Sequence, residues 1–458
     1  MVLRRFQQHL RATQGRPLAS VLALALAAWL ALPGDGPLPW LRLNLFDLYQ
    51  TALPRPRLSG PVAVIGIDEA ALKRYGQWPW PRTQLAHLID AVNAHHPLAI
   101  GLDIIMPETD SSSPEALAAR LRGTDAKLAE SLAALPPNDD VLAASIRRAP
   151  VVLGVAGFDV PAASTTDVVR AWPVRSLGGE ARQFVRHYPQ ALASLPQMQA
   201  NARGQAILSA DLETGLVRRV PLVASVGESL LPSLSLELLR VATGERAVGV
   251  HVGEGGIDSV SVGDLTVPTQ PGGRVWPHFS KSWPERYVSA AEVLDGRVAP
   301  DRLENRIAIV ALTGIGLNDY KTTARGQVVP GVDVHAELIE SFFDGRFVQR
   351  PPSIRWAEVG LFALLAALTI WLLPRFSLRA AAAAGLVLSA GLFGGGAALF
   401  WYAGLLFDAA SVWVALGFVG VTLLASLLSA AKRDRRESER ALQRARESAA
   451  RTAGELSA

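Results

Sequence analysis

Four long apolar runs lie along the chain, one near its start and three near its end. The first, Pro17–Pro33, is uncharged and follows several arginines; the others are Trp356–Leu373, Ala380–Phe400 and Ala409–Ala431. A helix needs about 20 residues to cross the hydrocarbon core of a bilayer. The pattern therefore predicts four membrane spans, and we expect the first to be an uncleaved anchor rather than a signal peptide.

The region between these runs has the pattern of a globular α/β domain. Four short, continuously apolar runs indicate buried strands: Val62–Ile67, Leu98–Leu102, Val151–Val155 and Arg306–Leu312. Helical spacing of apolar residues follows in Thr83–Ala94 and in Gly331–Phe343. Such alternation predicts a mostly parallel sheet covered on both faces. Shorter runs between residues 204 and 286 predict an antiparallel extension.

Composition and charge support a membrane protein with a large domain outside the cytoplasm. Half of the residues are hydrophobic, the mean hydropathy is +0.23, and the net charge is +4. The basic excess lies at both ends and in the loop Pro374–Arg379, as the positive-inside rule predicts for cytoplasmic segments; nucleic acid is therefore not an expected partner. We expect a basic cytoplasmic segment (1–16), a span (17–33), an outside domain (34–355), three spans (356–431) and a charged cytoplasmic tail (432–458).

Motifs for catalysis are weak. The chain has no cysteine, so disulfides, thiolate metal sites and cysteine nucleophiles are excluded. Gly314 and Gly316 follow a strand but lack the third glycine of a dinucleotide fingerprint. Asp333 and His335 are two residues apart on a helix and point to different faces, so a metal pair is not expected. We expect no enzymatic activity, no cofactor and no metal.

Acidic side chains at the ends of predicted strands are the first candidates for ligand binding. Asp68 and Glu69 follow one strand and Asp103 follows the next. Ligands of open α/β sheets bind beyond the carboxyl ends of the strands. The alternative is structural, because such acids also cap helices and close turns.

Four segments together resemble the type-two CHASE domains, the cyclase/histidine-kinase-associated sensory extracellular domains of bacteria. They are Val64–Arg82 with its Gly-x-Trp-Pro-Trp-Pro-Arg string, Ile100–Met106, Asp211–Pro221 and Asp319–Phe347. The resemblance implies a periplasmic sensory domain in a multi-pass protein of the inner membrane. Residues of these segments complete the tentative ligand-binding set: Trp78, Trp80, Arg82, Arg218, Arg219, Asp319 and His335. Packing is the alternative role for the tryptophans, and one of the two adjacent arginines is expected to pair with Asp68 and Asp103.

Relatives commonly continue into a cyclase or kinase domain, whereas here only a short charged tail follows the last span. The expected function is a sensor that detects an unknown signal or protein outside and relays it through four helices. Its output would pass to a cytoplasmic partner, or to the same tail in a homodimer. Two alternatives stay open: a periplasmic scaffold that binds other envelope proteins, and a periplasmic enzyme using Asp68, Asp103 and His335.

Overall fold

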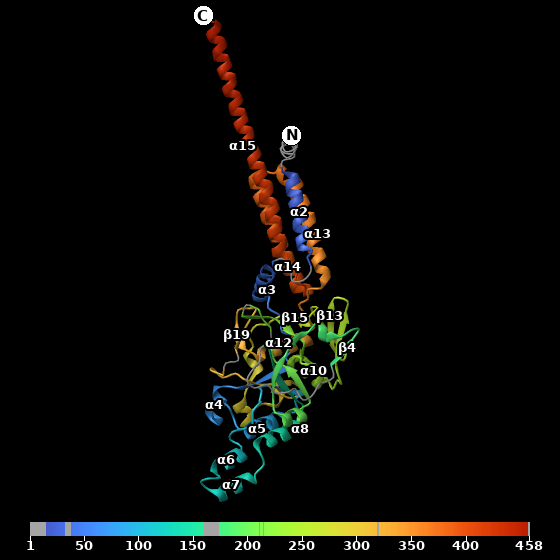
Figure 1. Cartoon of the computed structure of the whole chain (residues 1–458), viewed down its shortest axis with the longest axis vertical. Coiled ribbons are helices and arrows are strands. Elements are labelled where there is room, and N and C mark those ends of the chain that lie inside the picture. Colours follow the sequence, from blue (N-terminus) through green and yellow to red (C-terminus); the bar gives the residue numbers. More distant parts are fainter. Residues whose placement is uncertain are drawn as a thin grey trace. The chain divides into compact units, whose positions relative to one another are not determined.

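The computed structural model describes residues 15–32, 38–159, 174–209, 211–213, 215–317 and 320–456. The chain forms two compact units (Figure 1): one contains residues 1–46 and 350–458, and the other contains residues 47–349. The first unit is helical and the second is α/β, as the sequence pattern predicts. The boundary on the N-terminal side falls inside helix α3 (Pro39–Ala52), after Phe46.

A seven-stranded sheet forms the centre of the α/β unit. Its strand order is β16-β1-β17-β2-β3-β6, with β7 also paired to β3. All pairs are parallel except β3 with β6. The strands are β1 (Val62–Ile67), β2 (Ala99–Asp103), β3 (Val151–Phe158), β6 (Gln190–Ala193), β7 (Gly204–Ile207), β16 (Tyr287–Ser289) and β17 (Ile307–Leu312). The predicted parallel sheet is confirmed.

Helices cover both faces of this sheet, which explains why its strands are apolar throughout. One buried cluster joins Ile65 and Ile100 to helices α5 (Arg82–Asn93) and α8 (Asn138–Arg148). On the same side lie α4 (Glu69–Tyr75), α9 (Pro196–Asn201) and α11 (Ala290–Leu294). The opposite cluster joins Val64 and Ile309 to α10 (Leu234–Thr243) and α12 (Val332–Phe343). Successive strand residues point to opposite faces, so both faces need apolar side chains.

Three smaller sheets complete the unit, together with the α6 (Pro114–Leu121) and α7 (Ala126–Ala133) hairpin. Their strands are β4 (Val174–Leu177), β5 (Arg186–Tyr188), β8 (Asp211–Glu213), β9 (Leu216–Pro221), β10 (Val223–Val226), β11 (Ser229–Pro232), β12 (Val248–Gly253), β13 (Gly256–Val262), β14 (Leu265–Pro268), β15 (Arg274–Val275), β18 (Tyr320–Thr323) and β19 (Val328–Pro330). The predicted antiparallel extension is correct only in part. Strands β4, β5 and β18 come from outside residues 204–286, and each pairs in parallel with one strand of that region.

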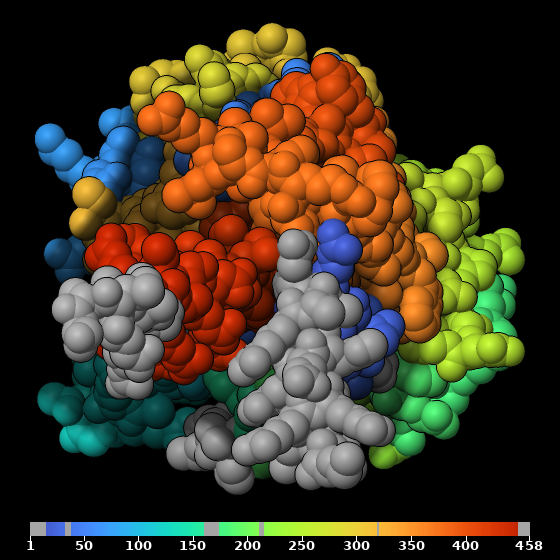
Figure 2. All heavy atoms as spheres, turned by 90° about the horizontal axis from the view of Figure 1, so that it is seen from above, coloured from blue at the N-terminus to red at the C-terminus, as the bar shows by residue number. Residues whose placement is uncertain are grey.

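The helical unit contains α2 (Arg16–Leu30), α13 (Pro352–Leu372), α14 (Leu378–Ala403) and α15 (Ala409–Leu456). Three helical segments are long and apolar enough to cross a membrane: 352–375, 378–403 and 409–447. Helix α2 has 15 residues, about 22 Å, against a hydrocarbon core of about 30 Å. The described residues thus support three spans rather than the four predicted. Helix α15 packs beside α13 and α14 (Figure 2) and α2 contacts both α13 and α15.

Candidate functional site

A stripe of four acidic residues follows one face of α12 and its C-terminal cap. Asp333, Glu337, Glu340 and Asp344 are spaced by four, three and four positions, which places them on one side of a helix. The opposite side packs on the central sheet through apolar residues. Glu340 and Asp344 have no exposed side-chain surface, and Asp333 retains 17%. Buried carboxylates of this kind require partners.

Three arginines supply these partners. Arg55 is fully buried, and its Nη2 lies 3.0 Å from Glu337 and 3.2 Å from Glu340. Its Nη1 pairs with Asp344. The three arginines and the four acids form one network of ion pairs, which we call the clamp. Its members are Arg55, Arg57, Arg286, Asp333, Glu337, Glu340 and Asp344.

Each of the other two arginines bridges several acids of α12. Arg57 lies 2.9 Å from Glu340 and 3.2 Å from Glu337. Arg286, which directly precedes strand β16, lies 2.6 Å from Glu337, 2.9 Å from Glu340 and 3.0 Å from Asp333. A guanidinium group has donors in several directions, so a single arginine satisfies more than one carboxylate.

Hydrogen bonds join the last turn of α3 and Leu53, just after it, to residues 277–279. Gln50 donates to the carbonyl of Pro277 at 2.7 Å and accepts from the amide of Phe279 at 3.0 Å. The ring of His278 donates through Nε2 to the carbonyl of Leu53 at 2.9 Å. Both groups are buried, so the chain around Arg55 has a fixed position.

Burial and pairing act in opposite directions on the protonation of these groups. Burial alone would raise the pKa of Glu337, but Arg286 and Arg55 hold that pKa at about 2. For Asp333 the effect of burial prevails over its pairing with Arg286, and the pKa is raised. Burial lowers the pKa of His278 to about 4. At neutral pH, Glu337 is therefore ionised and His278 is neutral.

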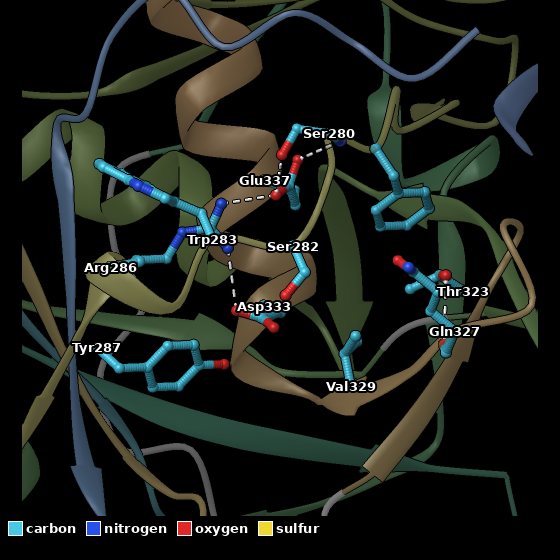
Figure 3. A pocket seen from close by; sticks show the side chains of 11 residues that line it. Ser280, Ser282, Trp283, Arg286, Tyr287, Thr323, Gln327, Val329, Asp333 and Glu337 are labelled. Atoms are coloured by element: carbon cyan, nitrogen blue, oxygen red, sulfur yellow. Dashed lines mark hydrogen bonds and ion pairs between the residues drawn. The ribbon is translucent and has the colours of Figure 1, made fainter. Parts of the chain in front are cut away.

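A pocket opens beside the clamp (Figure 3). Its empty volume is about 400 Å³, part of it open to solvent. The walls come from the segment before β16, from the β18–β19 hairpin and from the first half of α12: Phe279, Ser280, Ser282, Trp283, Arg286, Tyr287, Thr323, Gln327, Val329, Asp333 and Glu337. The Tyr287 hydroxyl is buried and points toward Asp333 without strict hydrogen-bond geometry. Burial, together with the nearby Asp333 carboxylate, raises the pKa of Tyr287.

The acids predicted at the strand ends have structural contacts. Asp68 caps α4 by accepting from the amide of Ala71 at 2.9 Å, and it also accepts from Ser289 at 2.8 Å. Glu69 accepts from the amide of Ile315 at 2.6 Å, which lowers the pKa of Glu69. Asp103 is half-buried at the end of β2. These contacts agree with the structural alternative for Asp68 and Glu69.

The aromatic and first arginine candidates lie where α5 begins. Trp80 is 2% exposed, donates to the carbonyl of Gly76 at 2.7 Å and packs against Trp78 with ring centroids 6.4 Å apart. The backbone amide of Arg82 donates to Asp110 at 2.7 Å. Because Trp80 belongs to the main core cluster, packing accounts for its burial.

The remaining candidates lie apart from these. Arg218 forms an ion pair with Asp47 at 2.6 Å; Asp68, one of the two acids predicted to pair with an adjacent arginine, contacts Ala71 and Ser289. Arg219 stacks on Trp276, 5.3 Å from the ring centroid. His335 is buried with its Nδ1 3.3 Å from the Ser235 hydroxyl. Asp319 lies outside the described residues. None of the predicted residues among those described lines the pocket of Figure 3.

The sequence carries one signal for the clamp, namely the helical spacing of its four acids. Its arginines have no such signal, because Arg55 is 282 positions from Glu337 and meets it only in the folded chain. The model of the CHASE2 domain family matches residues 21–374. The chain belongs to the CHASE2 domain family. The CHASE2 match contains the clamp, its pocket and α13, and confirms the resemblance. No curated protein and no solved structure shows significant similarity to the chain.

Proposed function

We propose that this CHASE2 protein is a sensor of the bacterial inner membrane whose α/β unit lies in the periplasm. A signal there would be relayed through the membrane helices to a cytoplasmic partner, or to the tail of a second copy. In this proposal the chain itself catalyses no reaction. Membership of a sensory domain family and three apolar helices support it.

The observation that carries the relay is the position of the clamp in the chain. The chain passes between its two units twice, after Phe46 and after Gln349. Arg55 and Asp344 are within ten residues of these two crossings, and they form an ion pair inside the α/β unit. A change in the clamp therefore acts on both connections at once. A ligand shifts such an equilibrium only when it binds the two states with different affinity.

The topology we propose places the basic loop between α13 and α14 in the cytoplasm. Helix α2 is short, but it contacts both α13 and α15. That packing supports a place for α2 in the same membrane layer, as a fourth helix. Both ends of the chain would then be cytoplasmic.

A reporter on the tail tests the relay. The chain has no cysteine, so Ser438→Cys gives one site for an environment-sensitive fluorophore on full-length protein in lipid nanodiscs. We expect Glu340→Gln, which weakens the clamp without changing its volume, to alter the emission. Glu292→Gln, at an exposed position of α11, is the matched control and should change nothing. Unchanged emission in a folded Glu340→Gln protein would contradict the relay.

Co-purification from native membranes identifies the output. We expect a cytoplasmic protein that is lost when residues 437–458 are removed. If only periplasmic proteins are recovered and the truncation has no effect, the sensor hypothesis is wrong and the periplasmic scaffold hypothesis is favoured.

A further inference from the structure

The pocket beside the clamp has mixed walls that suit a small polar ligand. Phe279, Trp283 and Val329 give it apolar surface, whereas Ser282, Thr323 and Gln327 give it hydroxyl and amide groups. Ligand pockets commonly combine apolar walls with a few well-placed polar groups. The empty space here, about 400 Å³, includes open solvent, so this pocket suits a ligand of only a few heavy atoms.

The charges around the pocket favour a cation. Four carboxylates of the clamp share three guanidinium groups. Arg286 donates from all three of its nitrogens to these acids, so it has little capacity left for an anionic ligand. Arg325 donates to the carbonyl of Ser280. An added anion would lie beside carboxylates whose guanidinium groups are already engaged.

Asp333 is the acid of the clamp that faces the pocket with the fewest partners. Only its Oδ1 receives a hydrogen bond from Arg286, at 3.0 Å, whereas Glu337 contacts all three arginines of the clamp. The buried Tyr287 hydroxyl lies next to it without strict hydrogen-bond geometry. Burial raises the pKa of Asp333, although Arg286 and Tyr287 act to lower it.

We infer that this pocket binds a small protonated amine, with the ammonium group held by Asp333 and by the oxygen of Tyr287. The ammonium has three donors and no acceptor. It would add a second positive charge beside Asp333, whose partner Arg286 is shared with Glu337 and Glu340. The alkyl part would lie against Phe279 and Val329. This inference rests on the proposed function, because it makes the amine the signal and places it on the helix that carries the clamp.

Binding to the full-length protein in detergent tests the inference directly. The probes are ethylammonium and 1,4-butanediammonium chlorides, compared with sodium chloride, sodium acetate and ethanol at matched ionic strength. We expect the amines to raise Tm and to give heat in a titration, and the three controls to do neither. Asp333→Asn should weaken amine binding about tenfold or more, because it removes a charged hydrogen-bond acceptor.

Two further variants make the result decisive. Tyr287→Phe removes only the hydroxyl and should weaken binding by a smaller factor, which settles the matter if Asp333→Asn does not fold. Asp264→Asn changes an exposed acid in the turn before β14 and should bind as the parent does. Absence of any amine effect, or equal binding by the parent and Tyr287→Phe, overturns the inference. The tail reporter with Glu340→Gln needs no ligand, so the relay stands or fails separately.

Discussion

His278 makes the stability of the α/β unit depend on pH. Its pKa in the folded protein is about 4, against 6.5 for an exposed imidazole, because burial disfavours the charged form. Its contribution to stability is complete above pH 6.5 and is lost as the pH falls toward 4. At 1.36 kcal/mol per unit of pKa, the loss is roughly 3 kcal/mol.

The measurement is Tm of the full-length protein between pH 7 and pH 4. His278→Gln keeps a donor for the carbonyl of Leu53 but does not titrate, so we expect its Tm to fall less over this range. His87→Gln, at an exposed position of α5, should follow the parent. Parallel curves for parent and His278→Gln would contradict the assignment.

Arg55 has the largest expected effect of any single residue in the clamp. Arg55→Met leaves Glu340 and Asp344, both fully buried, with fewer partners. Loss of one partner from a buried ion pair costs about 3–5 kcal/mol, and we expect Tm to fall accordingly. Arg297→Met, whose side chain is 62% exposed beside Asp295, should cost less than about 1 kcal/mol.

At the scale of elements, the helices and the sheet are packed too closely to accept added atoms at certain points. A Cβ on Gly101 in β2 would lie 2.9 Å from the side chain of Leu238 in α10. We expect Gly101→Ala to destabilise the unit by about 1–3 kcal/mol, as overpacking of cores does. Gly255→Ala, where the space is open, is the control in the same thermal unfolding experiment. Equal stability of the two variants would show that α10 can shift.

The elements are also the scale at which the sequence is most informative. Strands β1, β2, β3 and β17 follow from continuous apolar runs, because burial on both faces leaves no polar alternation. Helix α12 follows from its apolar spacing, and its acids share the other face. The length of α2 was harder to predict, since Pro17–Pro33 is apolar throughout and yet its helix ends at Leu30.

The candidate site was less predictable than the fold, for a physical reason. Strand-end acids are favoured both by ligand sites and by helix caps, and Asp68 proves to be a cap. The clamp depends on arginines whose partners are brought to them by the topology of the sheet. Local spacing contains no information on such contacts.

At the scale of the whole molecule, the absence of cysteine from the sequence permits a clean test of topology. Two single-cysteine variants suffice: Ser131→Cys, at an exposed position of α7, and Ser438→Cys, on the tail. In intact cells stripped of the outer membrane, we expect a membrane-impermeant maleimide to label Ser131→Cys and to spare Ser438→Cys until the membrane is lysed. Labelling of both, or of the tail alone, would contradict the proposed orientation.

Helix α15 runs without interruption for 48 residues, from its apolar start at Ala409 to Leu456. At 1.5 Å per residue this is about 70 Å of continuous hydrogen-bonded rod. An unbroken rod transmits torsion: a turn of its apolar half by a given angle turns the charged half by a similar angle. A partner protein that binds one face of the tail would therefore detect a rotation of that face about the helix axis, even when the tail has not moved along the axis.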